Sequence, residues 1–381
     1  MVELSKSKVN IISGIAILMA VYFIFCVPLR FDESQNIVIK KLSGLSGFVE
    51  KEGQLRIDAG KKLIDLSKTP ENANAPRDLK IIAETILAGA KKELKNPKLK
   101  GAGEKLQKAG TALLKLSETT GSLNTKLLNE KAQGLLAAGT KMTKKSARLM
   151  KMVSLRMYLS SYWKGLVVFG GLILILLVFA MRRNEPWAFP SMVTILSLPS
   201  IGGFYISLAG AVFFGVAAGF VPFVIGLIFF WAVVLIGFDS TKEKIIYFIV
   251  FTLLGMIGTD AFSFAEHGIR GILAMPYAAT ATDPAQSILR FSGPIALLTL
   301  IAVLTAIYKL AARKPIGWYF AMLSGMGIIT LGFPVDWLRP KDSFFIFGLK
   351  LSTYFFGGVL GLILVVILLL PYFKRELLPE K

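Results

Sequence analysis

The sequence contains very few residues of the types that bind metals or form covalent cross-links. Among its 381 residues there is one cysteine, Cys26, and one histidine, His267. A structural zinc site, an iron–sulfur cluster or a bis-histidine haem needs several such ligands, and an intrachain disulfide needs two cysteines. We therefore expect no metal, no cofactor and no disulfide in a single chain. Cys26 is interpreted as a small buried hydrophobic residue.

Sequence motifs of the common enzyme classes are also missing. There is no glycine-rich phosphate loop followed by Lys-Ser or Lys-Thr, no His-Glu-x-x-His and no Gly-x-Ser-x-Gly. Asp260 and Glu266 are acids near His267, but their six-residue spacing does not place them on one face of a helix. No catalytic residue is predicted. Enzymatic activity is possible, but no sequence feature indicates it.

Residues 30–163 are poor in aromatic residues and strongly basic. They hold 26 Lys and Arg against 13 Asp and Glu, so they carry +13 of the formal charge of +20. Proteins that bind single-stranded nucleic acid interleave aromatic stacking platforms with basic residues, and that pattern is missing, so no nucleic-acid partner is expected. Two interpretations remain open: a solvated basic surface, or a surface that attracts anionic lipid head groups or an anionic envelope polymer.

Apolar segments flank this basic stretch. With 54% hydrophobic residues and a mean hydropathy of +0.62, the chain is not typical of soluble globular proteins. The run Val9–Leu29 follows Lys6 and Lys8, is long enough to cross about 30 Å of hydrocarbon as a helix, and lacks a small-x-small cleavage site. We predict residues 1–29 to be an uncleaved signal-anchor helix with a cytoplasmic N-terminus.

The basic stretch has the apolar spacing of helices and no alternation typical of strands. Asp32, with Gln35 three positions later, predicts a helix start. Breaks are expected at residues 69–76, which contain two prolines and two asparagines, and at Asn96-Pro97. The expected helices after the first lie at about 78–94, at about 103–117 and from about 123 onward.

A faint internal repeat occurs in the same stretch. Residues 60–69 align with residues 110–119 at Gly, both Leu, Ser and Thr. Ala-Gly pairs recur at 59–60, 88–89, 109–110 and 138–139, and small residues let neighbouring helices approach closely. We predict that residues 30–163 form an extracytoplasmic domain, a helical bundle or stalk built from a duplicated hairpin and held by helix packing alone.

Residues 164–381 are predicted to form a transmembrane helix bundle of about seven spans. Tyr158, Tyr162 and Trp163 precede its first apolar run, where aromatic residues anchor a helix at the head-group level. Residues 186–238 have no formal charge over 53 positions. Two spans in this stretch place the basic short loops on one side of the membrane, as the positive-inside rule requires, and three spans do not.

The expected fold class is therefore all-α, a polytopic bundle of about eight spans with both termini cytoplasmic, in the plasma membrane. The basic domain is inserted between the first and second spans. The predicted spans lie near residues 9–29, 165–181, 202–220, 222–238, 245–259, 288–308, 316–331 and 344–370. The pairs Gly215/Gly219 and Gly357/Gly361 form small-xxx-small patterns that favour close helix packing, within the chain or between copies.

One cluster of ionisable residues lies in the apolar half, at the expected outer end of the fifth span: Asp260, Glu266, His267 and Arg270. Glu266 and Arg270 are four apart and share a helix face, and Asp336 in a second outer loop is placed to meet Arg270. Two interpretations are open. The cluster is a polar site for an ion, a proton or a substrate head group, or it is an amphipathic connecting loop with an intrahelical ion pair.

The sequence favours a non-enzymatic membrane component. In this hypothesis the basic domain docks partner subunits, other copies or an anionic lipid or envelope partner, and the helix bundle serves as an anchor or a path. Two alternatives remain. One is a transporter or export permease with a polar site near residues 260–270, and the other is a membrane enzyme acting on a lipid-linked substrate.

Overall fold

The computed structural model describes residues 4–69, 74–96, 99–118, 124–214, 220–274, 284–338 and 352–378. Within these ranges the chain forms helices and no strand, so the all-α prediction is confirmed. Contacts between residues divide the chain into two compact units. Unit 1 comprises Met1–Ile37 and Leu155–Lys381, and unit 2 comprises Val38–Ser154.

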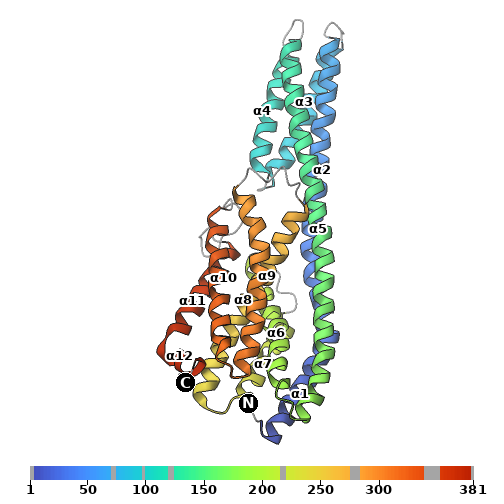
Figure 1. Ribbon diagram of the computed structural model, residues 1–381. Coiled ribbons are helices and arrows are strands. Elements are labelled where there is room, and N and C mark those ends of the chain that lie inside the picture. Colours follow the sequence, from blue (N-terminus) through green and yellow to red (C-terminus); the bar gives the residue numbers. More distant parts are fainter. Residues whose placement is uncertain are drawn as a thin grey trace. The chain divides into compact units, whose positions relative to one another are not determined.

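The helices follow one another with short connections (Figure 1). In chain order they are α1 (Lys6–Val21), the π-helix η1 (Tyr22–Cys26), α2 (Val27–Lys68), α3 (Ala75–Leu94), α4 (Lys100–Ser117), α5 (Thr125–Arg182), α6 (Ala188–Phe214), α7 (Phe220–Gly237), α8 (Thr241–Ala274), α9 (Pro284–Ala311), α10 (Ile316–Leu338), α11 (Thr353–Leu369) and α12 (Pro371–Leu377).

Within the described ranges, six helical segments are long and apolar enough to cross a membrane, as expected of an integral membrane protein. They are Lys6–Cys26, Ser161–Arg182, Ala188–Tyr205, Thr241–Ile269, Phe291–Ala311 and Ile316–Leu338. The pair α11 and α12, bent by 77°, would add a seventh if both helices belong to one span. In α7 the apolar part is shorter, Val224–Gly237. Two helices, α6 and α7, thus occupy the uncharged stretch, and the total of eight spans stays a prediction.

The helix start predicted at Asp32 is wrong. Asp32 lies inside α2, because helical backbone continues from α1 through η1 into α2. A capping side chain is useful only where the preceding backbone leaves the helix, and here it does not. The irregularity falls earlier, at η1, which ends two residues before Pro28. Its last residue, Cys26, is exposed, so the prediction that it is buried is wrong. A proline ring collides with the carbonyl four residues before it in a regular α-helix, and a wider π turn at that position accommodates the ring.

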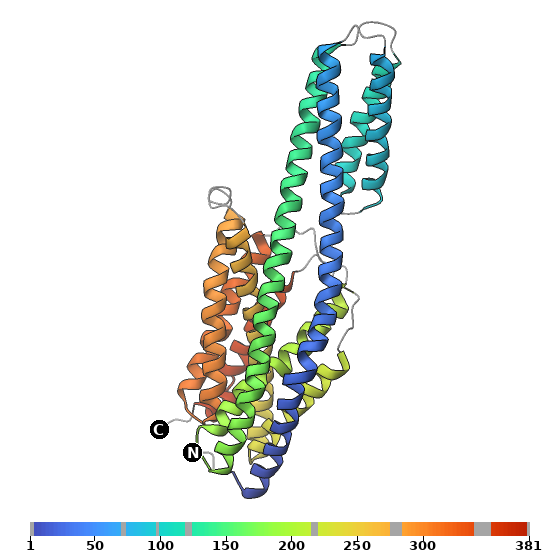
Figure 2. The same cartoon turned by 90° about the vertical axis from the view of Figure 1, so that its right-hand side faces the viewer.

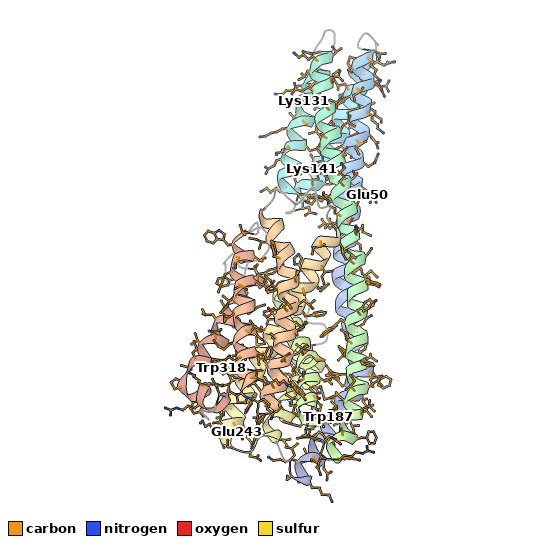
Figure 3. All side chains as sticks on the ribbon, in the orientation of Figure 1. Glu50, Lys131, Lys141, Trp187, Glu243 and Trp318 are labelled. Carbon is orange, nitrogen blue, oxygen red and sulfur yellow. The ribbon has the colours of Figure 1, made fainter. Side chains whose placement is uncertain are left out.

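Ion pairs join several loops at one end of unit 1. Lys8 of α1 pairs with Asp239, which follows α7. Arg313, between α9 and α10, pairs with Glu243 of α8 at 3.0 Å, and Lys242 pairs with Glu376 of α12 at 2.8 Å. Figure 3 labels Glu243 at this end of the bundle. The basic loops that the charge bias assigned to one side of the membrane therefore meet at one end of unit 1.

Unit 2 has an apolar core of its own, formed by the parts of α2 and α5 that belong to it together with α3 and α4. Figures 1 and 2 show α2 and α5 side by side in this unit, with the shorter helices α3 and α4 beside them. The core consists of aliphatic residues at helical spacing, including Leu63, Leu79, Ile86, Leu113, Leu128 and Leu135. The core thus draws residues from all four helices.

The internal repeat extends through the helices of unit 2 with a period of 50 residues, and one close packing contact repeats with it. A Cβ on Gly60 of α2 would lie 2.8 Å from Leu136 of α5, and a Cβ on Gly110 of α4 would lie 3.1 Å from Ile86 of α3. The contacts α2·α5 and α4·α3 are thus equivalent, as a duplicated hairpin requires. The identical positions include Gly53/Gly103, Ala59/Ala109, Gly60/Gly110, Leu63/Leu113, Leu66/Leu116, Ser67/Ser117, Ala88/Ala138, Gly89/Gly139, Lys91/Lys141 and Lys95/Lys145.

Candidate polar site in the helix bundle

Asp260 is a carboxylate in the interior of unit 1. It is 4% exposed and lies within α8, inside the candidate span Thr241–Ile269. The predicted span ends at about residue 259, whereas α8 continues to Ala274, and the position of Asp260 at the outer end of the span stays a prediction. The sequence from Thr259 onward is polar in composition, but Ala261, Phe264 and Ala265 continue the buried face of the helix.

A second helix supplies the hydrogen bond to this carboxylate. The hydroxyl of Tyr205 in α6 donates to Oδ2 of Asp260 over 3.2 Å. Close contact between the helices one turn earlier makes this bond possible: a Cβ on Gly202 of α6 would lie 2.9 Å from Oγ1 of Thr259. Only a glycine allows α6 to approach α8 this closely at that point.

A third helix, α11, covers the other side of the site. A Cβ on Gly357 would lie 3.3 Å from Oδ2 of Asp260 and 3.0 Å from the ring of Phe264. One turn earlier, Tyr354 stacks on Phe264 with ring centroids 3.9 Å apart and planes inclined by 15°. Helices α6, α8 and α11 therefore meet around the Asp260 carboxylate.

The electrostatic environment of Asp260 is unusual. Among the side chains that the structure describes, Tyr205 is its hydrogen-bond partner and no cation pairs with it. A carboxylate charge without a partner is costly in a protein interior, and more so inside a membrane. Ionisable groups kept in such positions are typical of proton relays and ion sites.

The other acidic and basic residues of the predicted cluster are less central. Glu266 and His267 are half-buried on α8, and the ring of His267 lies 6.1 Å from that of Tyr354. Oδ1 of Asp336 accepts the backbone N–H of Ser352, just before α11, at 3.1 Å. The side chain of Arg270 lies outside the described residues, and so does its expected contact with Asp336.

The glycine pairs are placed as follows. Gly215 and Gly219 lie outside the described residues. Gly357 lies against α8, as described above, whereas Gly361 lies against α10, where its Cβ would collide with the carbonyl of Gly325 and with Ile328. One small-xxx-small pattern therefore brings α11 close to two different helices.

The aromatic residues of α5 lie on two faces of that helix. Tyr158 and Tyr162 are exposed, and their hydroxyls are hydrogen-bonded at 3.0 Å. Trp163 packs instead on Phe262 of α8, with ring centroids 4.8 Å apart. Their role as anchors at the head-group level stays a prediction.

The sequence alone did not identify Tyr205, Phe264 or Tyr354 as parts of the site. A signal for Tyr205 exists, because it is the only tyrosine in the uncharged stretch 186–238, and a buried tyrosine hydroxyl usually finds a polar partner. The identity of that partner depends on how α6 packs on α8, 55 residues further along the chain. No local pattern contains this information.

Within the described ranges, no three His, Cys, Asp or Glu side chains lie close enough together to hold a metal ion. No family model, no curated protein and no solved structure matches the chain. A proposal about function therefore rests on the geometry around Asp260.

Proposed function

We propose that the protein is an integral membrane transport component in which Asp260 takes up and releases a proton or a small monovalent cation. The observation that carries this proposal is a carboxylate, 4% exposed, held by one tyrosine hydroxyl in the interior of a bundle of apolar helices. A carboxylate is energetically costly in a membrane, and ionisable residues found there usually have a function.

The surroundings support this role. Stacked Phe264 and Tyr354 form one wall, and the glycine contacts at Gly202 and Gly357 leave little space around the carboxylate. Low polarity strengthens the interaction of Asp260 with any bound cation. Pro199 lies within α6, six residues before Tyr205. A proline removes a backbone hydrogen bond from a helix, so it provides a point at which α6 can bend and move the Tyr205 hydroxyl.

The proposed membrane arrangement keeps eight spans, with both termini cytoplasmic, the basic domain outside and the plasma membrane as location. Support comes from the ion pairs of Lys8, Lys242 and Arg313, which bring the basic loops to one end of unit 1. Loops rich in Lys and Arg favour the cytoplasmic side, whereas long external domains cross the membrane largely regardless of charge.

The test is an ion-flux measurement on the purified full chain in liposomes. An internal pH dye, and in parallel a sodium dye, report influx under an imposed potassium diffusion potential. We expect flux of one of the two ions above that of empty liposomes, and at least a tenfold loss in Asp260→Asn. Asp58→Asn is the matched control, because it removes the same charge from an exposed carboxylate in unit 2.

Two results would overturn the proposal. One is an unchanged flux in Asp260→Asn, and the other is a wild-type flux of both ions equal to that of empty liposomes. Elution volume and thermal unfolding in detergent establish that each variant is folded. The docking function that the sequence favours concerns unit 2 and does not depend on the outcome of this experiment.

A further inference from the structure

The part of α5 that belongs to unit 2 carries a row of uncompensated positive charge. Between Glu130 and Glu185 the chain has no acidic residue. Five exposed cations follow each other at helical spacing, so they share one face of α5. We call this row the α5 basic stripe: Lys141, Lys144, Lys145, Arg148 and Lys151.

The opposite face of α5 packs against α2, which fixes the direction of the stripe. Gly139 lies against the backbone of α2, where its Cβ would be 2.6 Å from the carbonyl oxygen of Gly53. Ser146 is buried and hydrogen-bonded to Ser46 of α2, with their Oγ atoms 2.9 Å apart. Because the stripe lies about half a helical turn away from these residues, it faces outward from the α2·α5 pair.

No described side chain neutralises the stripe. The nearest acid on α5 is Glu130, which lies 3.9 Å from Lys131 and eleven positions before Lys141. Eleven residues of α-helix span about 16 Å, and charges separated by more than about 8–10 Å are largely screened at physiological salt. The exposed face of α4 differs, because Glu104 accompanies Lys105 and Lys108 there.

The stripe is a narrow line and not a broad patch. Its five cations cover ten residue steps, or about 15 Å of helix. The neighbouring helix α2 exposes a mixture of charges, Glu50 beside Lys51 and then Asp58, and Figure 3 labels Glu50 on α2 and Lys141 on α5. A flat anionic membrane surface would meet these acids together with the lysines, whereas a single chain of anionic groups can follow the line of cations alone.

The residue types also indicate the partner. Four of the five cations are lysines, which are strongly hydrated point charges and are depleted in protein–protein interfaces, where arginine is enriched. No aromatic residue lies within Lys141–Lys151 to stack on a base. We propose that the α5 basic stripe binds a linear, hydrated polyanion, for which inorganic polyphosphate is the probe.

The test uses the purified full chain in neutral detergent and fluorescently labelled inorganic polyphosphate as the probe, with binding followed by anisotropy at two salt concentrations. The stripe variant replaces all five cations with glutamine, as Lys141→Gln, Lys144→Gln, Lys145→Gln, Arg148→Gln and Lys151→Gln. The matched control removes the same net charge from exposed lysines elsewhere in unit 2, as Lys61→Gln, Lys62→Gln, Lys91→Gln, Lys105→Gln and Lys115→Gln.

We expect the stripe variant to lose at least tenfold in affinity and the control less than threefold. Wild-type affinity should fall as salt rises, because binding releases counterions from the polyanion. Equal losses in both variants would overturn the proposal, since net charge alone would then explain binding. So would tighter binding to phosphatidylglycerol vesicles, to an acidic helical peptide or to single-stranded DNA than to polyphosphate, or no binding of polyphosphate at low salt.

Discussion

The most informative perturbation of unit 2 is Arg56→Met, because Arg56 is the cation inside its core. Arg56 is 3% exposed and Glu93 of α3 is fully buried. Both guanidinium Nη atoms donate to the Glu93 carboxylate, Nη2 over 2.7 Å, and Nη1 also donates to the carbonyl oxygen of Glu52 at 3.0 Å. Glu52 adds a second buried carboxyl group, whose Oε2 has no hydrogen-bond partner among the described atoms.

The expected magnitude follows from this geometry. Methionine replaces the unbranched stem of arginine without its charged group, so Arg56→Met leaves Glu93 buried and unpaired next to Glu52. Removing one partner of a buried ion pair costs about 3–5 kcal/mol, against a total stability of about 5–15 kcal/mol for a typical domain. The double variant Arg56→Met/Glu93→Met removes both charges together. We expect it to be within about 1 kcal/mol of the wild type or more stable, since apolar replacement of a whole buried pair is often neutral or stabilising.

Hydrogen–deuterium exchange of the full chain in detergent measures this effect locally. The observable is the exchange rate of the α3 amides, and α8 serves as the internal reference. A loss of about 3–5 kcal/mol corresponds to exchange faster by roughly two to four orders of magnitude, since each 1.4 kcal/mol is a factor of ten. The reasoning is refuted if α3 in Arg56→Met exchanges within threefold of the wild-type rate. It is also refuted if the double variant exchanges as fast as the single one.

Two further predictions concern the same unit. Burial, followed by the charge of Glu93, raises the pKa of the Glu52 carboxyl, against the opposing effects of Lys92 and Arg56. The contribution of Glu52 to the stability of unit 2 should therefore be largest below the ordinary Glu pKa of about 4.3 and should be lost as the pH rises through the raised pKa. Glu52→Gln should flatten this dependence in thermal unfolding between pH 4 and pH 8. Gly139→Ala should destabilise the α2·α5 contact by about 1–3 kcal/mol, because its Cβ meets backbone atoms of Gly53 and Ile57. Gly134→Ala, in open space on the same helix, should be neutral or stabilising by up to about 1 kcal/mol. Chemical unfolding that ranks the two alanine variants in the opposite order would contradict the close-packing argument.

Much of the helical layout could be predicted from local residue types. The break at residues 69–76 and the one at Asn96-Pro97 are predicted by Pro and Asn, and α3 and α4 begin and end within three residues of the expected positions. The predicted helix start at Asp32 and the predicted end of the fifth span differ from the structure for one reason. At both places the helix continues past residues whose types predict an end. Aspartate is a residue type that often caps helices, but Asp32 lies inside α2. The polar residues after Thr259 belong to α8, whose buried face is still apolar there.

The candidate site could be predicted only in part. Asp260 was identifiable because an ionisable residue in an apolar stretch is rare. Tyr205 was not, because its contact with Asp260 depends on packing between helices. The Arg56–Glu93 pair was missed for a different reason. In a stretch with 26 basic and 13 acidic residues, charged residues look like surface, and no pattern distinguishes the few that are buried.

Two of the buried acidic residues, Glu93 and Asp260, differ in the partner that each has in the interior. Glu93 lies opposite a bidentate guanidinium, which is the arrangement that makes a buried charge tolerable in a structural role. Asp260 has a tyrosine hydroxyl and no described cation. If Asp260 were structural, an asparagine would serve better, because it keeps an acceptor for Tyr205 and carries no charge. Asp260→Asn should therefore leave thermal stability unchanged or raise it while abolishing ion flux. A clear loss of stability together with unchanged flux would instead make Asp260 a packing residue.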